Sequence, residues 1–122
     1  MRAIIVEDEF LAAIHAEAVL ESCGVEVIGM AEDMEGALAL TDGQPNIALV
    51  DLNLRDGFTG PAIGSSLARA GIEIVFVTAN PSQLEGCNEF ASAVIEKPID
   101  ERLLVDTIER IKQQAQPRPS AV

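Results

Sequence analysis

Chemically active side chains stand at the ends of four short apolar runs in this sequence. The runs are rich in β-branched residues and lie at residues 3–6, 47–50, 72–77 and 93–95. The side chains near their ends are, in chain order, Glu7 and Asp8, Asp51, Thr78, and Lys97. Carboxylates that converge in a low-dielectric pocket repel one another, so such a pocket either raises a pKa or holds a cation. Oxygen-only ligands suit Mg²⁺, and Mn²⁺ could replace it.

Thr78 and Lys97 add the groups that phosphoryl oxygens require. A threonine offers a hydroxyl donor and a lysine offers a compact positive charge. A carboxylate nucleophile such as Asp51 can form an aspartyl phosphate, while a metal and a lysine neutralise the charge on the transferring oxygens. Taken singly, Asp8 could cap a helix, Thr78 could be a turn hydroxyl and Lys97 could be a solvated lysine. The combination at four strand ends favours phosphoryl transfer, with Asp51 as the acceptor.

These side chains can meet only if the apolar runs form neighbouring strands. A fifth run lies at residues 25–30, and the segments between the runs have helical spacing with turn residues at their borders. Continuous apolar strands joined by helices imply a parallel sheet that is covered on both faces. We therefore predict a flavodoxin-like (βα)5 three-layer α/β sandwich. The strand order 2-1-3-4-5 of such folds would place Asp8 beside Asp51, where the strand order reverses and ligands bind.

The connecting segments predict five helices. Asp33 can cap the second helix, the third should span residues 59–70, the short fourth starts at Pro81 and the fifth opens at Asp100. Gly24 supplies a stop for the first helix. The residues expected on the inward faces are Leu11, Ile14, Ala18 and Val19 in the first helix, and Leu103, Leu104, Ile108 and Ile111 in the fifth.

Length and composition narrow the classes of function. The 122 residues fit one domain, which we expect at residues 1–115, followed by a disordered C-terminal tail at residues 116–122. A net charge of -12 disfavours direct binding to nucleic acid or to a membrane surface. No run approaches the ~20 apolar residues of a membrane span, and no secretory signal pattern is present, so we expect a cytoplasmic protein. Cys23 and Cys87 lie far apart without a CxxC pattern, so we expect buried or semi-buried thiols rather than a zinc site or a redox motif.

The sequence resembles the receiver domains of bacterial two-component response regulators over about residues 2–113. The matching motifs are Val6-Glu7-Asp8-Glu9, Leu49-Val50-Asp51-Leu52-Asn53-Leu54 with Asp56-Gly57, Val77-Thr78-Ala79, and Glu96-Lys97-Pro98. The resemblance implies that Asp8, Asp51 and the backbone carbonyl of Asn53 hold Mg²⁺. It also implies that Glu7 acts on the metal through a water molecule.

The resemblance assigns roles to the residues around the acceptor as well. Thr78 and Lys97 would bind the phosphoryl oxygens, and Ala79 would leave the approach open. The peptide bond between Lys97 and Pro98 is commonly cis in this family. Asn53 and Asn80 would flank the path of the hydrolytic water and tune the lifetime of the phosphoryl group.

The function implied is a phosphorylation-dependent signalling switch. A histidine kinase or a histidine phosphotransfer protein would phosphorylate Asp51, and the domain would catalyse only its own phosphorylation and dephosphorylation. Output would pass through the surface of the fourth helix, fifth strand and fifth helix, by binding a partner protein or by forming a homodimer. Val94 stands where receivers usually carry an aromatic ring. We therefore expect switching to act through Thr78 and the segment after the fourth strand.

Three alternatives differ in the residues they require. A haloacid-dehalogenase-type phosphatase needs a second aspartate two residues after its nucleophile, where this chain has Asn53. A flavodoxin-like cofactor carrier needs a hydroxyl- or glycine-rich loop after the first strand, where this chain has Glu7-Asp8-Glu9. A receiver-fold interaction scaffold that acts with little or no phosphorylation is compatible with Val94. His15, the single histidine, is expected to be structural.

Overall fold

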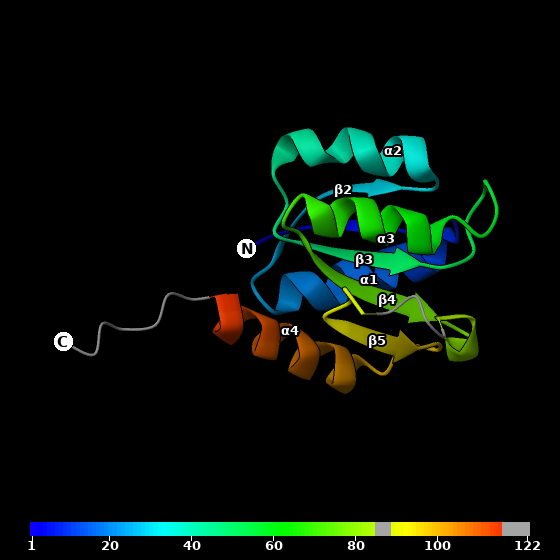
Figure 1. Cartoon of the computed structure of the whole chain (residues 1–122). Coiled ribbons are helices and arrows are strands. Elements are labelled where there is room, and N and C mark those ends of the chain that lie inside the picture. The colour runs from blue at the N-terminus through cyan, green and yellow to red at the C-terminus, as the bar shows by residue number, and fades with distance from the viewer. Residues whose placement is uncertain (85–88, 116–122) are drawn as a thin grey trace.

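The computed structural model describes residues 1–84 and 89–115, and within them the chain forms one parallel five-stranded sheet, four α-helices and two 3₁₀ helices (Figure 1). The strands are β1 (Arg2–Val6), β2 (Glu26–Ala31), β3 (Ile47–Asp51), β4 (Glu73–Thr78) and β5 (Ala93–Glu96). The helices are α1 (Phe10–Ser22), α2 (Met34–Ala39), α3 (Gly60–Arg69), α4 (Glu101–Ala115), η1 (Leu40–Gly43) and η2 (Pro81–Leu84). The strand order is β2-β1-β3-β4-β5, as predicted.

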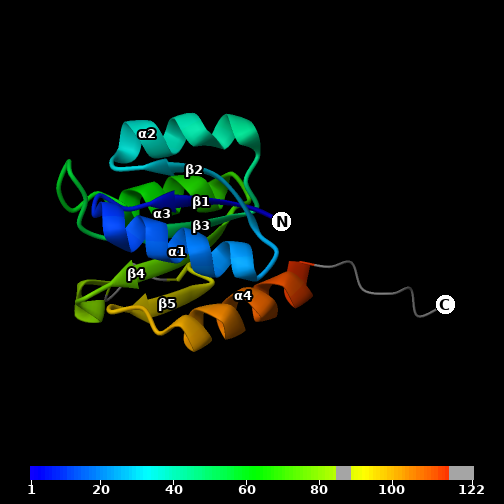
Figure 2. The same cartoon turned by 180° about the vertical axis from the view of Figure 1, so that it is seen from behind.

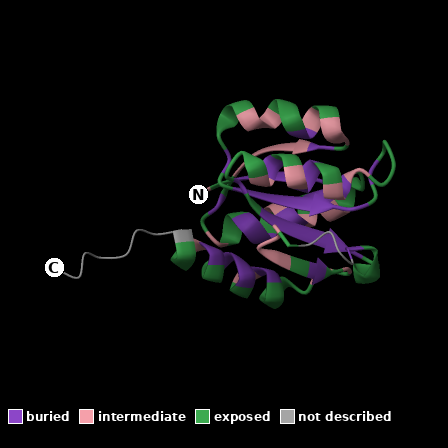
Figure 3. Ribbon diagram, viewed as in Figure 1, coloured by how far each residue is buried: buried purple, intermediate pink, exposed green. Residues whose placement is uncertain are grey.

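The sheet forms the middle of three layers. Helices α2 and α3 cover one face, and α1 and α4 cover the other, as the two opposite views show (Figures 1 and 2). Each face has its own apolar core: α1 and α4 pack on one, and α2, α3 and η2 pack on the other. The central strands are buried from both sides, which explains their continuous apolar sequences (Figure 3).

Local sequence signals set most helix boundaries. The side chain of Asp33 accepts a hydrogen bond of 2.9 Å from the backbone N–H of Gly36 at the start of α2, as an N-cap does. Gly71, with φ at +85°, follows the end of α3. The predicted fourth helix begins at Pro81 as the 3₁₀ helix η2, so α4 corresponds to the predicted fifth helix.

The predicted inward face of α1 is wrong except for Val19. The buried residues of this helix are Ala13, Ala16, Val19 and Leu20. Leu11 is 76% exposed and Ile14 is 40% exposed, and Ala18 is exposed as well. Alanines on the buried side allow the helix to lie close to the sheet, whereas the longer Leu11 and Ile14 would hold it away.

Helix α4 follows its prediction more closely. Leu104, Ile108 and Ile111 are buried, but Leu103 is 49% exposed because it lies on the outer side of the helix beside Leu104. The predicted tail at residues 116–122 lies outside the described residues, as does Cys87. Cys23 is a half-buried free thiol. Within the described part of the chain, no helix is both long enough and apolar enough to cross a membrane.

Candidate functional site

The strand register brings the predicted residues to one edge of the sheet. Strands β1 and β3 are parallel neighbours with Val6 opposite Val50, so the chain leaves both strands at the same level. On the other side of β3, Asp51 lies opposite Val77, and Thr78 of β4 lies opposite Glu96 of β5. The carboxyl ends of β1, β3, β4 and β5 therefore share one edge (Figure 1).

Three carboxylates converge at this edge. Glu7, Asp8 and Asp51 each offer an oxygen atom, and these atoms all lie within 4.8 Å of one another. Glu7 and Asp51 are each only 8% exposed, whereas Asp8 is exposed to solvent. The site is therefore an acidic pocket that is buried at Glu7 and Asp51 and open to solvent at Asp8.

Lys97 lies between the two buried acids. Its ammonium nitrogen Nζ is 2.6 Å from Oε1 of Glu7 and 2.9 Å from Oδ2 of Asp51. The backbone of Lys97 is fixed as well, because its N–H donates a hydrogen bond of 2.8 Å to the carbonyl oxygen of Thr78. The peptide bond from Lys97 to Pro98 is cis, as the family resemblance predicted.

The electrostatics of the pocket follow from burial and charge. Burial raises the pKa of Glu7 most, the adjacent Asp51 raises it further, and Lys97 opposes both, so that the pKa of Glu7 is about 7. Burial alone would lower the pKa of Lys97, but its hydrogen bonds to Glu7 and Asp51 outweigh burial and raise that pKa above its usual value. The ammonium group of Lys97 pairs with the two buried acids, whereas Asp8 adds a third carboxylate to the cluster, so the pocket fits a further hard cation with oxygen ligands.

Thr78 lies at the end of β4 and is fully buried. Its Oγ1 accepts a hydrogen bond of 3.0 Å from the backbone N–H of Asn80, so the hydroxyl retains its own hydrogen for donation. Ala79 is exposed and, with Lys97 and Pro98, lines a groove of about 390 Å³ at the mouth of the pocket. His15 lines the same groove, and its Nε2 lies 2.7 Å from Oε1 of Glu101, which links α1 to α4.

Asn53 and Asn80 lie on the rim of the pocket. Asn53 is exposed, and its backbone N–H points toward Oδ1 of Asp51 at 3.4 Å. Its side-chain Nδ2 donates a hydrogen bond of 3.1 Å to Oε1 of Gln83, a residue of η2 that no sequence motif indicated. The only sequence signal for Gln83 was its place in the turn that begins at Pro81.

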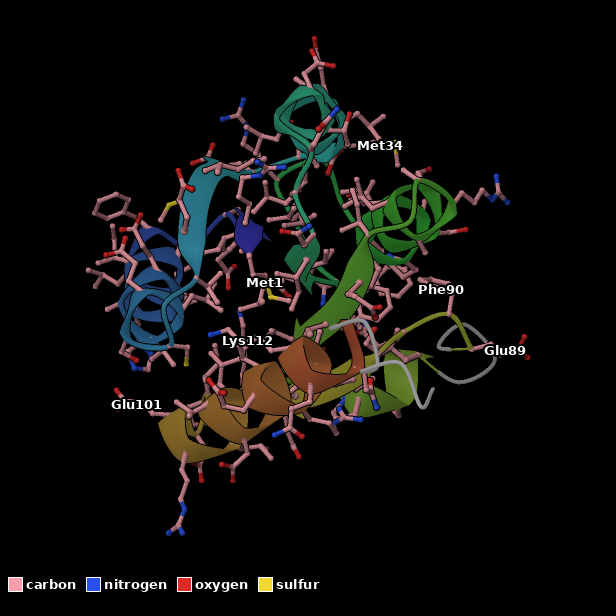
Figure 4. The ribbon with its side chains drawn as sticks, turned by 90° about the vertical axis from the view of Figure 1, so that its left-hand side faces the viewer. Met1, Met34, Glu89, Phe90, Glu101 and Lys112 are labelled. Carbon is pink, nitrogen blue, oxygen red and sulfur yellow. The ribbon has the colours of Figure 1, made fainter. Side chains whose placement is uncertain are left out.

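Val94 lies on the same side of the sheet as two of the four phenylalanines of the sequence, Phe76 and Phe90. Val94 is 37% exposed on β5 and pairs with Phe76 of β4, so both side chains point to the α3 side of the sheet. Phe76 is fully buried, and Phe90 packs edge-on against it with 5.7 Å between ring centroids. Phe90 lies beside α3 (Figure 4). These two rings therefore belong to the α3-side core rather than to the exposed surface of β5.

The chain is thus a parallel α/β domain with sheet order 2-1-3-4-5, whose carboxyl edge carries a lysine and an acidic cluster that could hold a cation. The sequence matches the response regulator receiver domain over residues 3–109, and the chain belongs to this family. Receiver domains are signalling modules rather than metabolic enzymes, and a phosphorylation-type signalling switch fits this membership. Their metal is typically Mg²⁺, which suits the three converging carboxylates.

The chain is also similar in sequence to individual curated regulators. The chain is 34% identical over 99 residues to the phyllosphere-induced regulator PhyR of Methylorubrum extorquens, covering 78% of this chain and 37% of that protein. It is 34% identical over 121 residues to the sensory transduction protein LytT of Bacillus cereus, covering 95% of this chain and 49% of that protein. The chain thus spans half or less of these curated relatives.

A solved receiver domain has the same fold. The solution NMR structure of the PhyR response regulator receiver domain from Erythrobacter litoralis superposes with a TM-score of 0.83 at 27% identity. That comparison covers 99% of this chain and 95% of the other.

Proposed function

We propose that this domain is a phosphorylation-dependent switch in which a histidine kinase or a histidine phosphotransfer protein transfers a phosphoryl group to Asp51. The observation that supports this most directly is the environment of Asp51. Its buried carboxylate lies 2.9 Å from the ammonium group of Lys97, within an acidic cluster that is open to solvent on the side of Asp8. The Asp51 carboxylate is held by the ammonium group of Lys97 and lies in a cluster that could bind a second cation. Such a nucleophile is suited to accept an anionic phosphoryl group, because the cations neutralise its charge.

The transfer can be written with the residues of this chain. A carboxylate oxygen of Asp51 forms a bond to phosphorus, while the bond from phosphorus to the donor's imidazole nitrogen breaks and that nitrogen keeps the electron pair. Lys97 orients Asp51 beforehand and then binds a phosphoryl oxygen. The Thr78 hydroxyl, which already accepts a hydrogen bond from the N–H of Asn80, can turn its own hydrogen toward another phosphoryl oxygen.

The residues present fit a magnesium ion. Asp8, Asp51 and the backbone carbonyl of Asn53 would hold it, and Glu7 would act behind them through a water molecule. When bound, the ion supplies positive charge to the oxygens of the transferring group. Three carboxylate oxygens within 4.8 Å of one another support this assignment.

Dephosphorylation and output would use the rim and the neighbouring surface. Asn53 and Asn80 flank the approach to Asp51 and would tune how quickly water hydrolyses the acyl phosphate. The domain would thus catalyse only its own phosphorylation and dephosphorylation. Movement of Thr78 would pass to the segment that follows β4, and then to a surface formed with β5 and α4 that binds a partner protein or a second copy.

Intact-mass spectrometry tests this proposal. The chain is incubated with Mg²⁺ and either acetyl phosphate or a phosphohistidine donor, and one added phosphoryl mass is expected. Asp51→Asn should abolish the adduct, whereas Asp42→Asn should retain it, because Asp42 is an exposed acid of η1, which precedes β3 and lies away from its carboxyl end. An adduct that persists in Asp51→Asn would overturn the assignment of the acceptor.

The same experiment separates the proposal from an interaction scaffold. Val94, in the place of the usual ring, is compatible with a receiver-fold scaffold that acts with little or no phosphorylation. If wild-type protein gains no adduct from any donor, the scaffold function is supported instead.

A further inference from the structure

The loop between β3 and α3 is joined to the start of α2, and the joining group is the carboxylate of Asp56. We propose that Asp56 is a positioning residue for the cation site: by tying this loop to α2, it fixes the place of the Asn53 carbonyl. This inference rests on the proposed function, in which that carbonyl faces the metal.

The carboxylate of Asp56 accepts hydrogen bonds at the N-termini of both α2 and α3. Its Oδ2 accepts a hydrogen bond of 3.1 Å from the backbone N–H of Met34, the first residue of α2. Its Oδ1 accepts a hydrogen bond of 2.5 Å from the Thr59 hydroxyl, directly before α3. Met34 lies between α2 and α3, which shows how near the two helices come (Figure 4). The exposed carboxylate thus joins the loop that leads into α3 to the start of α2, 22 positions earlier in the chain.

The turn that carries Asp56 has a defined shape. Leu54 and Gly57 exchange two backbone hydrogen bonds of 2.9 Å each, so Arg55 and Asp56 form the tip of a tight turn. Gly57 has φ at +106°, a conformation that favours glycine. The backbone N–H of Arg55 also donates to the carbonyl oxygen of Glu32 at 3.2 Å, so the tip rests on the end of β2.

Asn53 lies between this turn and the acceptor. Leu52 is fully buried and Leu54 is 6% exposed, so the chain is anchored on both sides of Asn53. The turn beside Leu54 is held at Arg55 by Glu32, at the end of β2, and at Asp56 by the start of α2. Release of Asp56 would therefore let the Asn53 carbonyl move relative to Asp51 while leaving β3 in place.

The charge of Asp56 supports the attachment. The Thr59 hydroxyl, and then the N–H of Met34, hold the pKa of Asp56 below its usual value, so the group is an anion at neutral pH. An anion at the start of a helix is favourable, and a charged acceptor forms stronger hydrogen bonds than a neutral one.

Asp33 provides a matched control. It also caps α2, through a hydrogen bond of 2.9 Å to the N–H of Gly36, but it makes no side-chain hydrogen bond to the loop that follows Asp51. Asp33→Ala should weaken α2 about as much as Asp56→Ala does, and it should leave the position of Asn53 unchanged.

The test is a titration of the full chain with Mg²⁺, in which the amide chemical shifts of Asp51, Asn53 and Thr78 are monitored. The thermal unfolding of each variant is measured separately in EDTA. Asp56→Ala is expected to raise the Kd for Mg²⁺ roughly three- to tenfold, less than the ~10–100-fold typical of direct outer-shell partners of metal ligands. Asp56→Asn, which keeps one acceptor oxygen, should recover part of the loss. Asp33→Ala should change the Kd less than about twofold while it lowers the Tm similarly.

Equal Kd values in Asp56→Ala and wild type, or equal changes in Asp56→Ala and Asp33→Ala, would overturn the positioning role and leave the proposed function intact. A wild-type protein that shows no Mg²⁺-dependent shifts would overturn both. If Asp56→Ala does not fold, Thr59→Val removes one of the two contacts and should raise the Kd in the same direction by a smaller factor.

Discussion

The ammonium group of Lys97 lies 2.9 Å from Oδ2 of Asp51, although the two residues are 46 positions apart in the chain. The same group lies 2.6 Å from Oε1 of Glu7. Lys97 is thus the counter-charge of two buried acids before any phosphoryl group is bound. Because it already holds Asp51, its transfer to a phosphoryl oxygen would require only a small movement.

Replacing Lys97 should affect both stability and phosphorylation. Lys97→Met leaves two buried carboxylates without their partner, and we expect a loss of about 1.5–3 kcal/mol in the free energy of unfolding in EDTA. It should also sharply reduce the phosphoryl adduct on Asp51. Urea denaturation and intact-mass spectrometry measure the two effects.

Lys112→Met is the control for that experiment. Lys112 is a second half-buried lysine, on α4, where it donates a hydrogen bond to the carbonyl of Cys23. This variant should lose stability but keep the adduct. Wild-type rates of adduct formation in Lys97→Met would contradict the assigned role of Lys97.

Thr78 should carry the effect of phosphorylation beyond the pocket. In wild-type protein with Mg²⁺ and a phosphate mimic, we expect amide chemical-shift changes across residues 78–97. Thr78→Val should still bind the mimic at Asp51, but the changes should stay close to the pocket because the hydroxyl no longer follows the phosphoryl oxygens.

Thr107→Val is the matched control, since Thr107 is also buried and donates a hydrogen bond within α4, to the carbonyl of Leu103. It should show the full wild-type pattern of shifts. An identical pattern in Thr78→Val and wild type would contradict a switch that acts through Thr78.

The sheet and its active edge could be predicted because each strand is a continuous apolar run that ends in polar residues. Parallel strands bring these ends together, so the meeting of Asp8, Asp51 and Lys97 followed from the strand order. The contact between Lys97 and Glu7 could not be predicted, because it depends on the path of the chain after β5. The contacts of Asp56 and Gln83 likewise join segments that no local pattern connects.

The inward face of α1 was predicted wrongly for a related reason. Apolar residues occupy most sides of this helix, so their spacing does not select one face. The distance between helix and sheet selects it, and small side chains such as Ala13 and Ala16 allow the closest approach. In α4, by contrast, apolar and charged residues alternate with a clear helical period, and the prediction of Leu104, Ile108 and Ile111 is confirmed.

The corrected face of α1 can be tested by two substitutions. Leu11→Ala, at a position that is 76% exposed, should change the free energy of unfolding by less than about 0.5 kcal/mol. Ala16→Leu, at a position that is 3% exposed, should cost about 1–3 kcal/mol because the added atoms force α1 away from the sheet. Urea denaturation of both variants checks this, and the reverse order of effects would contradict the observed face.

Alanine substitutions at two glycines of α3 should distinguish the stability of the fold from the position of the Asp51 backbone. A Cβ atom on Gly64 would lie 2.5 Å from Cζ of Phe76, a buried ring of the core. A Cβ atom on Gly60 would lie 2.2 Å from the backbone oxygen of Asp51 and 2.4 Å from Cα of Leu52. The first contact displaces a side chain, whereas the second displaces the backbone of the acceptor itself.

We therefore expect Gly64→Ala to lower the free energy of unfolding by about 1–3 kcal/mol, partly offset by the ~1 kcal/mol gained in helix propensity. Phosphoryl uptake should remain, and Phe76→Leu in the same chain should restore part of the stability. Gly60→Ala should lose more stability and most of the phosphoryl adduct at Asp51. Urea denaturation and intact-mass spectrometry measure these effects, and normal phosphoryl uptake by a folded Gly60→Ala protein would show that the backbone of Asp51 tolerates displacement.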